Sequence, residues 1–208
     1  MLKKISYPFM IIWVVLFITA CNDNSSPQIG KHYTLLDNDL TSLNLDPITE
    51  VFSLTCGHCW NMEKSIPEIE SKTNNKVGKV HVTFNKNAQT SALLYYAAVM
   101  QLDTTPSHQL VDQLFSAVQA KTDTVAQQKQ IIENVFISNK LASPYDFDSK
   151  QGTKLAEHMR LATTVTNQAN INSVPSFIIK GKYLLLNEGH QDIDDLAKTI
   201  NYLLSQPE

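Results

Sequence analysis

Residues 48–63 read Ile-Thr-Glu-Val-Phe-Ser-Leu-Thr-Cys-Gly-His-Cys-Trp-Asn-Met-Glu. The part from 48 to 54 is rich in β-branched and aromatic residues, as in a buried strand, and the part from 60 to 66 suits a helix. Cys56 and Cys59 therefore lie where a strand gives way to a helix. Unpaired N–H groups and the helix dipole at such a junction favour a thiolate over a thiol. Because thiolates carry out thiol–disulfide exchange, the motif predicts an active site of that kind.

The third cysteine, Cys21, ends an N-terminal segment that is typical of a secretory signal. Two lysines near the start precede an uncharged apolar stretch from 9 to 19, and small residues follow. The stretch is shorter than the roughly 20 residues that a membrane-spanning helix needs. We expect residues 1–20 to be a bacterial lipoprotein signal peptide and Cys21 to carry the lipid. An uncleaved anchor or an ordinary signal peptide is the alternative, and each version exports the chain to a compartment where disulfides persist.

The rest of the chain has the size of one domain. Residues 22–27 are polar and turn-forming, so we expect a flexible tether over residues 21–30 and a single domain over 31–208. The net charge is −3 and the lysines are scattered, which argues against a nucleic-acid surface. We expect a monomer.

The patterns beyond the motif alternate between strands and helices. Strands are expected at 32–36, 48–54, 79–84, 176–179 and 183–186, with a hairpin turn at 180–182. Helices are expected at about 59–71 with an interruption at Pro67, at 91–102, near 110–118, near 131–136, from a start at Ser143-Pro144-Tyr145-Asp146, along 155–165 and at 193–203. This order of elements predicts an α/β, thioredoxin-like fold with a helical insertion at about 87–168.

Two segments resemble the signatures of the DsbA family of bacterial disulfide oxidoreductases. They are residues 50–63, around Cys-Gly-His-Cys, and residues 174–183, which read Val-Pro-Ser-Phe-Ile-Ile-Lys-Gly-Lys-Tyr. The similarity in element order extends over nearly all of the chain from about His32 onward. The resemblance implies a DsbA-like fold in which Pro175 is a cis proline beside the cysteines and Val174 presents its backbone to an extended substrate. Without the cysteine motif, this proline would be an ordinary residue at the start of a strand.

Three charged residues also match the family pattern. The resemblance implies that Glu50, Glu63 and Lys79 lie near the active site, tune the cysteines and assist proton transfer. Glu50 is the strongest candidate, because it lies within an apolar strand and burying an unpaired charge costs several kcal/mol. Glu63 and Lys79 could equally be ordinary solvated residues.

The two residues between the cysteines depart from the family pattern. They are Gly57 and His58, whereas the family typically has Pro-His; Gly-His is the pair of eukaryotic protein disulfide isomerases. His58 would favour the Cys56 thiolate and so make the disulfide more oxidising. Gly57 leaves the redox potential open, and we expect a milder oxidant than the family's most oxidising members. Cys56 should be the exposed sulfur that substrates attack, and Cys59 its shielded partner.

The resemblance also implies a function and its partners. The protein would donate disulfide bonds to exported polypeptides with free thiols, facing the periplasm from a bacterial membrane. A DsbB-type, quinone-linked inner-membrane protein would accept its electrons, and no cofactor would be needed. The sequence does not distinguish inner from outer membrane. A disulfide reductase or isomerase is the closest alternative, and a non-enzymatic lipoprotein with a structural disulfide is the other.

Metal and haem sites find no support in the sequence. A zinc site at the two cysteines would need two further ligands, whereas the histidines are scattered singly at His32, His81, His108, His158 and His190. Haem attachment needs a histidine directly after the second cysteine, and Trp60 stands there. We expect His81 on the covered side of the sheet, and His108, His158 and His190 at surface or cap positions.

Overall fold

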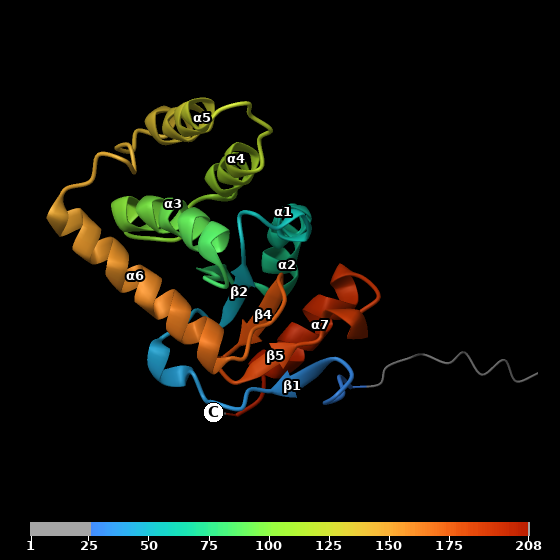
Figure 1. Cartoon of the computed structure of the whole chain (residues 1–208). Helices are drawn as coiled ribbons and strands as arrows, with labels where there is room; N and C mark the ends of the chain where they lie inside the picture. The colour runs from blue at the N-terminus through green and yellow to red at the C-terminus, as the bar shows by residue number, and fades with distance from the viewer. Residues whose placement is uncertain (1–25, 208) are drawn as a thin grey trace, which may run out of the picture.

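The computed structural model of the chain describes residues 26–207 (Figure 1). The signal peptide expected at 1–20 and the lipid site at Cys21 lie outside these residues. Among the residues described, no helix combines the length and the apolar character that crossing a membrane requires.

A five-stranded mixed sheet forms the centre of the molecule. Its strands, in spatial order, are β1 (Tyr33–Leu35), β5 (Tyr183–Leu185), β4 (Ser176–Ile179), β2 (Ile48–Phe52) and β3 (Val77–His81). β2 runs parallel to β3 and antiparallel to β4, and every residue of these three strands is buried. The end of β2, which leads into the cysteine motif, is therefore held from both sides.

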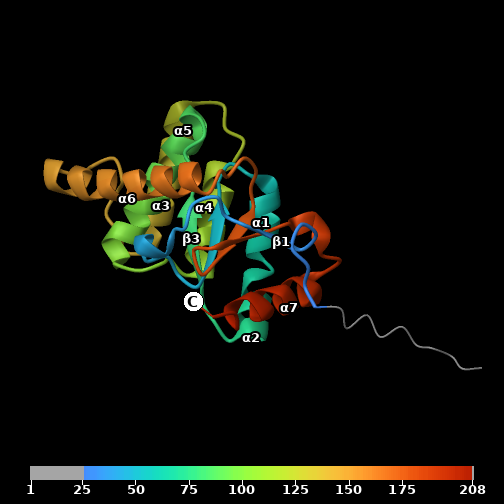
Figure 2. The same cartoon turned by 90° about the horizontal axis from the view of Figure 1, so that it is seen from below.

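Seven helices surround the sheet in the described part of the chain. They are α1 (Gly57–Glu63), α2 (Ile66–Thr73), α3 (Lys86–Leu102), α4 (His108–Val118), α5 (Val125–Ser138), α6 (Ser149–Gln168) and α7 (Ile193–Leu204), with short 3-10 turns at Thr41–Leu43 and Asn187–Gly189. Figures 1 and 2 show α3 to α6 gathered on one side of the sheet, whereas α2 and α7 lie together on the other.

The two faces of the sheet bury two hydrophobic cores. Val51 and Ile178 belong to the larger core, which they share with α3 to α6. Ile48 and Phe177 belong to the smaller one, which they share with α2 and α7. Because neighbouring strand residues point to opposite faces, Glu50 lies on the same face as Ile48. A carboxylate therefore enters the space under α1 and α2.

The helix expected at 59–71 is interrupted, as the proline predicted. α1 ends at Glu63 and α2 begins at Ile66, with Pro67 in the first turn of α2. A proline is tolerated there because its missing N–H would have no helical partner. α1 also begins earlier than expected, at Gly57, because Cys56 caps its N-terminus.

The helix start expected at Ser143 is wrong. Residues 143–146 form a turn in which the Ser143 hydroxyl donates to Glu133 and accepts the N–H of Tyr145. α6 begins after Asp148, whose carboxylate accepts the N–H of Gln151 at 2.8 Å while the Gln151 side chain accepts the N–H of Asp148 at 3.0 Å. Two nearby segments carry capping residues, and only the second closes a reciprocal capping box.

Two other boundaries differ from expectation, and one turn is confirmed. β3 covers 77–81 instead of 79–84, and α3 begins before 91 because Asn85 caps it by accepting the N–H of Ala88. The hairpin turn between β4 and β5 is present, with positive φ values of 53° at Lys180 and 66° at Gly181. Glycine suits the second position, since a Cβ there would lie 3.0 Å from the Leu40 backbone.

Candidate active site

Cys56 is the N-cap residue of α1. Its half-buried Sγ accepts the backbone N–H of Cys59 at 3.1 Å. Both cysteines are free thiols in this structure. An N–H bond and the positive end of a helix dipole both stabilise negative charge on a sulfur. The next residue but one, His58, is exposed to solvent.

Cys59 lies one turn into α1 and is fully buried. Burial strongly raises the pKa of its thiol, and the contact with Cys56 and the charges of Cys56 and Glu50 raise it further. A thiolate formed at this position would therefore take up a proton. The two sulfurs differ as expected, with one accessible and one shielded.

The loop before β4 brings Val174 and Pro175 to the cysteines. The peptide bond between these two residues is cis, as the resemblance implied. The carbonyl oxygen of Val174 lies 3.5 Å from the Cys56 Sγ, and Asn187 donates to the carbonyl of Pro175 at 2.7 Å. Backbone and reactive sulfur thus lie side by side, although 118 positions separate them.

Side chains of α4 fasten the active-site segment to the helical layer. The Trp60 indole N–H donates to Asp112 at 2.6 Å, and the Trp60 ring is stacked on Phe115 with an interplanar angle of 4°. Gln119 donates to the carbonyl of Leu54 at 2.9 Å. The sequence carries no signal for these contacts, because they depend on how α4 packs against α1.

His81 supports the same segment from below. It is fully buried, as expected from the covered side of the sheet. Its Nε2 accepts the N–H of Leu54 at 2.9 Å, and its Nδ1 lies 2.8 Å from the carbonyl oxygen of Val82. Burial lowers the pKa of His81 to about 4. The ring is thus neutral at physiological pH, with its proton on Nδ1.

Beneath α1, three charged side chains form a buried cluster. Glu50 and Lys79 are paired in register on β2 and β3, and Lys79 donates to Glu50 Oε2. The Lys79 Nζ also lies 2.7 Å from Glu63 Oε2. The side chains of Glu50 and Lys79 are 1% exposed and that of Glu63 is 4% exposed, so the alternative of solvated residues is wrong for Glu63 and Lys79.

The cluster holds two carboxylates against one ammonium group. Burial raises the pKa of Glu50, although the charge of Lys79 opposes the rise. Burial also disfavours the charged form of Lys79, but the charges of Glu50 and Glu63 outweigh it and raise the pKa of the lysine. Lys79 therefore stays charged, and the cluster has an excess of one negative charge whenever both carboxyl groups are ionised.

The expectation of ordinary surface or cap positions is wrong for His108. Its side chain is 37% exposed, with Nδ1 2.8 Å from Glu63 Oε1 and Nε2 3.4 Å from Glu70 Oε2. His190 is partly buried and donates to or accepts from Thr199, and His158 is stacked on Tyr96. None of these contacts could be read from single histidines in the sequence.

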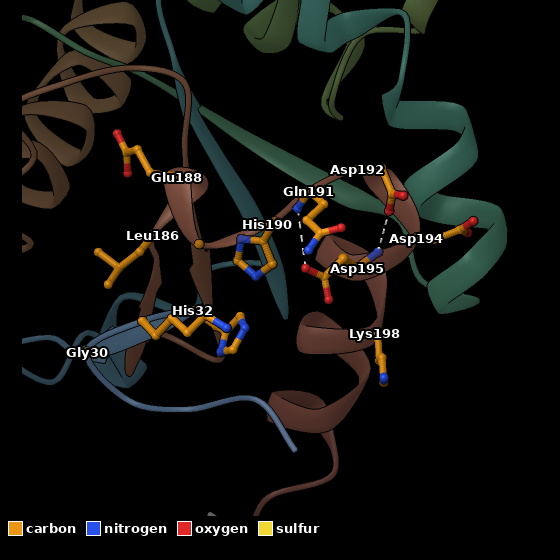
Figure 3. Close-up of a pocket in the computed structure, with 12 residues that line it drawn as sticks. Gly30, His32, Leu186, Glu188, His190, Gln191, Asp192, Asp194, Asp195 and Lys198 are labelled. Atoms are coloured by element: carbon orange, nitrogen blue, oxygen red, sulfur yellow. Dashed lines mark hydrogen bonds between the residues drawn. The ribbon is translucent and has the colours of Figure 1, made fainter. Parts of the chain in front are cut away.

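A separate cleft of about 840 Å³ lies away from the cysteines (Figure 3). Its wall includes His32 and His190, whose ring centroids are 5.6 Å apart, and acidic residues at the start of α7. Within residues 26–207, no group of three or more His, Cys, Asp or Glu side chains is arranged to hold a metal ion.

The sheet, the inserted helices, the capping cysteine and the cis-proline loop together define a DsbA-like thioredoxin fold. Residues 45–202 match the sequence model of the family described as Thioredoxin, and the chain belongs to this family. No curated protein matches the chain in sequence.

Solved structures of disulfide oxidoreductases are similar to this chain in fold. Proteus mirabilis DsbA is 22% identical, with a TM-score of 0.63 over 87% of this chain and 98% of that one. A Pseudomonas aeruginosa DsbA variant is 16% identical, with a TM-score of 0.67 over 86% and 97%. Salmonella enterica serovar Typhimurium DsbL is 17% identical, with a TM-score of 0.63 over 88% and 100%.

Proposed function

We propose that this protein is a thiol–disulfide oxidoreductase that donates a Cys56–Cys59 disulfide to exported polypeptides. The arrangement of the two sulfurs carries the proposal. Cys56 Sγ caps a helix next to the carbonyl of Val174, whereas Cys59 is buried behind it. This asymmetry gives one sulfur that a substrate reaches and one that leaves into the interior.

The reaction consists of two exchanges. A substrate thiolate attacks Cys56 Sγ, the Cys56–Cys59 bond breaks, and Cys59 leaves with the electron pair and takes up a proton. The substrate's second thiolate then attacks the substrate sulfur of the mixed disulfide and releases Cys56 as a thiolate. The substrate loses two electrons, which the two cysteines gain. The N–H of Cys59 stabilises the departing Cys56 thiolate, which makes it a good leaving group.

The neighbouring residues have roles that follow from their positions. Val174 and Pro175 offer backbone to an extended substrate beside Cys56, and His58 adds to the stabilisation of its thiolate. Glu50, Glu63 and Lys79 adjust the charge around Cys59 and supply its proton. A structure of Proteus mirabilis DsbA with a non-covalently bound peptide supports a peptide as the occupant of this surface.

Turnover needs an electron acceptor, for which we propose a DsbB-type, quinone-linked protein of the inner membrane. The thiol chemistry itself needs no cofactor. The exchange takes place in the periplasm, where the solved relatives act.

The stability of the two redox forms tests the oxidase function. Contacts that stabilise the Cys56 thiolate exist only when the disulfide is open, so the reduced domain should resist denaturant better than the oxidised one. A structural disulfide has the opposite effect. Denaturation of both forms at neutral pH measures the difference, and His58→Ala should narrow it. A clearly more stable oxidised form would replace this proposal with a reductase or a structural role.

Cys21 is proposed as the lipid anchor of the domain. Cys21→Ser should release the protein into the soluble periplasmic fraction or leave an unprocessed precursor, while exchange activity is retained because the site lies in residues 48–175. Detergent partitioning of both proteins is the measurement. Membrane attachment of the variant without precursor would instead indicate a retained anchor helix.

A further inference from the structure

A continuous chain of polar contacts leads from the buried cluster to the surface. Lys79 bridges Glu50 and Glu63, and the second oxygen of Glu63 lies 2.8 Å from His108 Nδ1. The other ring nitrogen, Nε2, faces Glu70 Oε2 at 3.4 Å. Exposure rises along this chain, from 1% at Glu50 and Lys79 to 37% at His108.

The surface end of this chain opens into a cleft. His108, Glu70 and Lys76 help to line a hollow of about 470 Å³. His108 is the first residue of α4, so its ring lies between the covered layer below α1 and this hollow. Among the described residues in contact with the three buried charges, only His108 both titrates near neutral pH and reaches solvent.

Both ring nitrogens of His108 face carboxylate oxygens. A neutral imidazole can donate to only one of them, whereas an imidazolium donates to both. The other charged groups nearby do not compete for the ring. Lys76 donates to Glu70 at 2.7 Å, and Asp112, one turn further along α4, accepts from Trp60. The surroundings of His108 therefore suit a group that binds and releases a proton.

The inner end of the chain has an open acceptor. Glu50 Oε1 is buried and has no hydrogen-bond partner in the described part of the chain. The Glu50 charge also acts on the Cys59 thiol, which places the two groups near each other. A proton on Glu50 would remove the cluster's excess negative charge and lie where the Cys59 thiolate needs it.

We propose that His108 is the proton inlet of the active site and a positioning residue for the exchange reaction. This inference rests on the proposed function. When Cys59 leaves as a thiolate, it takes a proton from Glu50. His108 gives its Nδ1 proton to Glu63, Glu63 and Lys79 each pass on one proton, and Glu50 is protonated again. Solvent in the cleft then reprotonates the ring. The net result is one proton moved from the imidazolium to Cys59, and reoxidation reverses the direction.

The test measures the rate at which a dithiol peptide reduces the oxidised protein, from about pH 5 to about pH 8. His108→Asn retains a donor near the Nδ1 position but cannot exchange protons in this range. It should slow the reaction by about tenfold or more and remove the histidine-dependent part of the pH profile. His158→Asn is the matched control and should leave rate and profile unchanged. In His108→Ala, added imidazole should enter the cleft and restore part of the rate.

The outcomes separate this inference from the proposed function. A wild-type protein that does not oxidise the peptide overturns both. An active wild type together with a His108→Asn variant of unchanged rate and pH profile overturns the inlet alone. A slower variant that keeps the wild-type pH profile, with no response of His108→Ala to imidazole, assigns His108 a purely structural role and also overturns the inlet. Denaturant midpoints of the variants establish that the folded proteins are compared.

Discussion

Cys59→Ala is expected to abolish turnover and to trap substrates on the protein. Without Cys59, the Cys56 thiolate still attacks a peptide disulfide, but no internal thiol remains to resolve the mixed disulfide. The rate of disulfide exchange should fall to the uncatalysed background. Covalent complexes should accumulate, detectable as a mass increase that reducing agent removes.

Cys56→Ala is the matched control for this experiment. It leaves Cys59 as the only thiol of the site, and that thiol is fully buried and held in its protonated form by burial. The variant should lose exchange activity as well, but it should form no covalent complexes. Complexes of equal yield in both variants would show that substrates reach Cys59 and would contradict the assignment of the attacking sulfur.

Lys79→Met is expected to destabilise the folded protein by about 3–5 kcal/mol. The methionine fills much of the same volume, so the loss comes chiefly from two buried carboxylates without a cation. Lys76→Met is a control on a neighbouring lysine whose side chain is 87% exposed, and it should cost less than about 1 kcal/mol. Denaturant unfolding at neutral pH measures both variants.

The pH dependence distinguishes buried charge from lost packing. Burial already raises the pKa of Glu50 above its usual value of 4.5, and removal of Lys79 should raise it further. An acid with a raised folded pKa destabilises the fold above its unfolded pKa, so the deficit of Lys79→Met should shrink as pH falls toward about 4. The double variant Glu50→Gln/Lys79→Met should recover part of the loss at neutral pH. A deficit independent of pH would indicate a packing defect instead.

Short motifs made the two halves of the site predictable. Cys56 and Cys59 are three residues apart at a strand–helix junction, so their local geometry follows from the sequence around them. Pro175 could be assigned because the residues around it resemble a known signature. Glu50 stood out because a charge in an apolar strand needs a partner.

The missing parts depend on tertiary packing. Lys79 and Glu63 are charged residues of the kind usually found in solvent, and only the register of β3 and the position of α1 show that they are buried. His108 is 45 positions from Glu63, and no local pattern connects the two. The false helix start at Ser143 arose because a capping pattern predicts a possible start without choosing between two neighbouring candidates.

The pairing of Glu50 with Lys79 also fixes the alignment of the two parallel strands. If β3 shifted by one residue, Gly78 or Val80 would lie opposite Glu50, and the ammonium group would point to the other face of the sheet. A carboxylate would then be buried without a partner, at a cost of several kcal/mol. The ion pair therefore selects one strand register among the alternatives and thereby sets the height at which β2 delivers Cys56 to the proline loop.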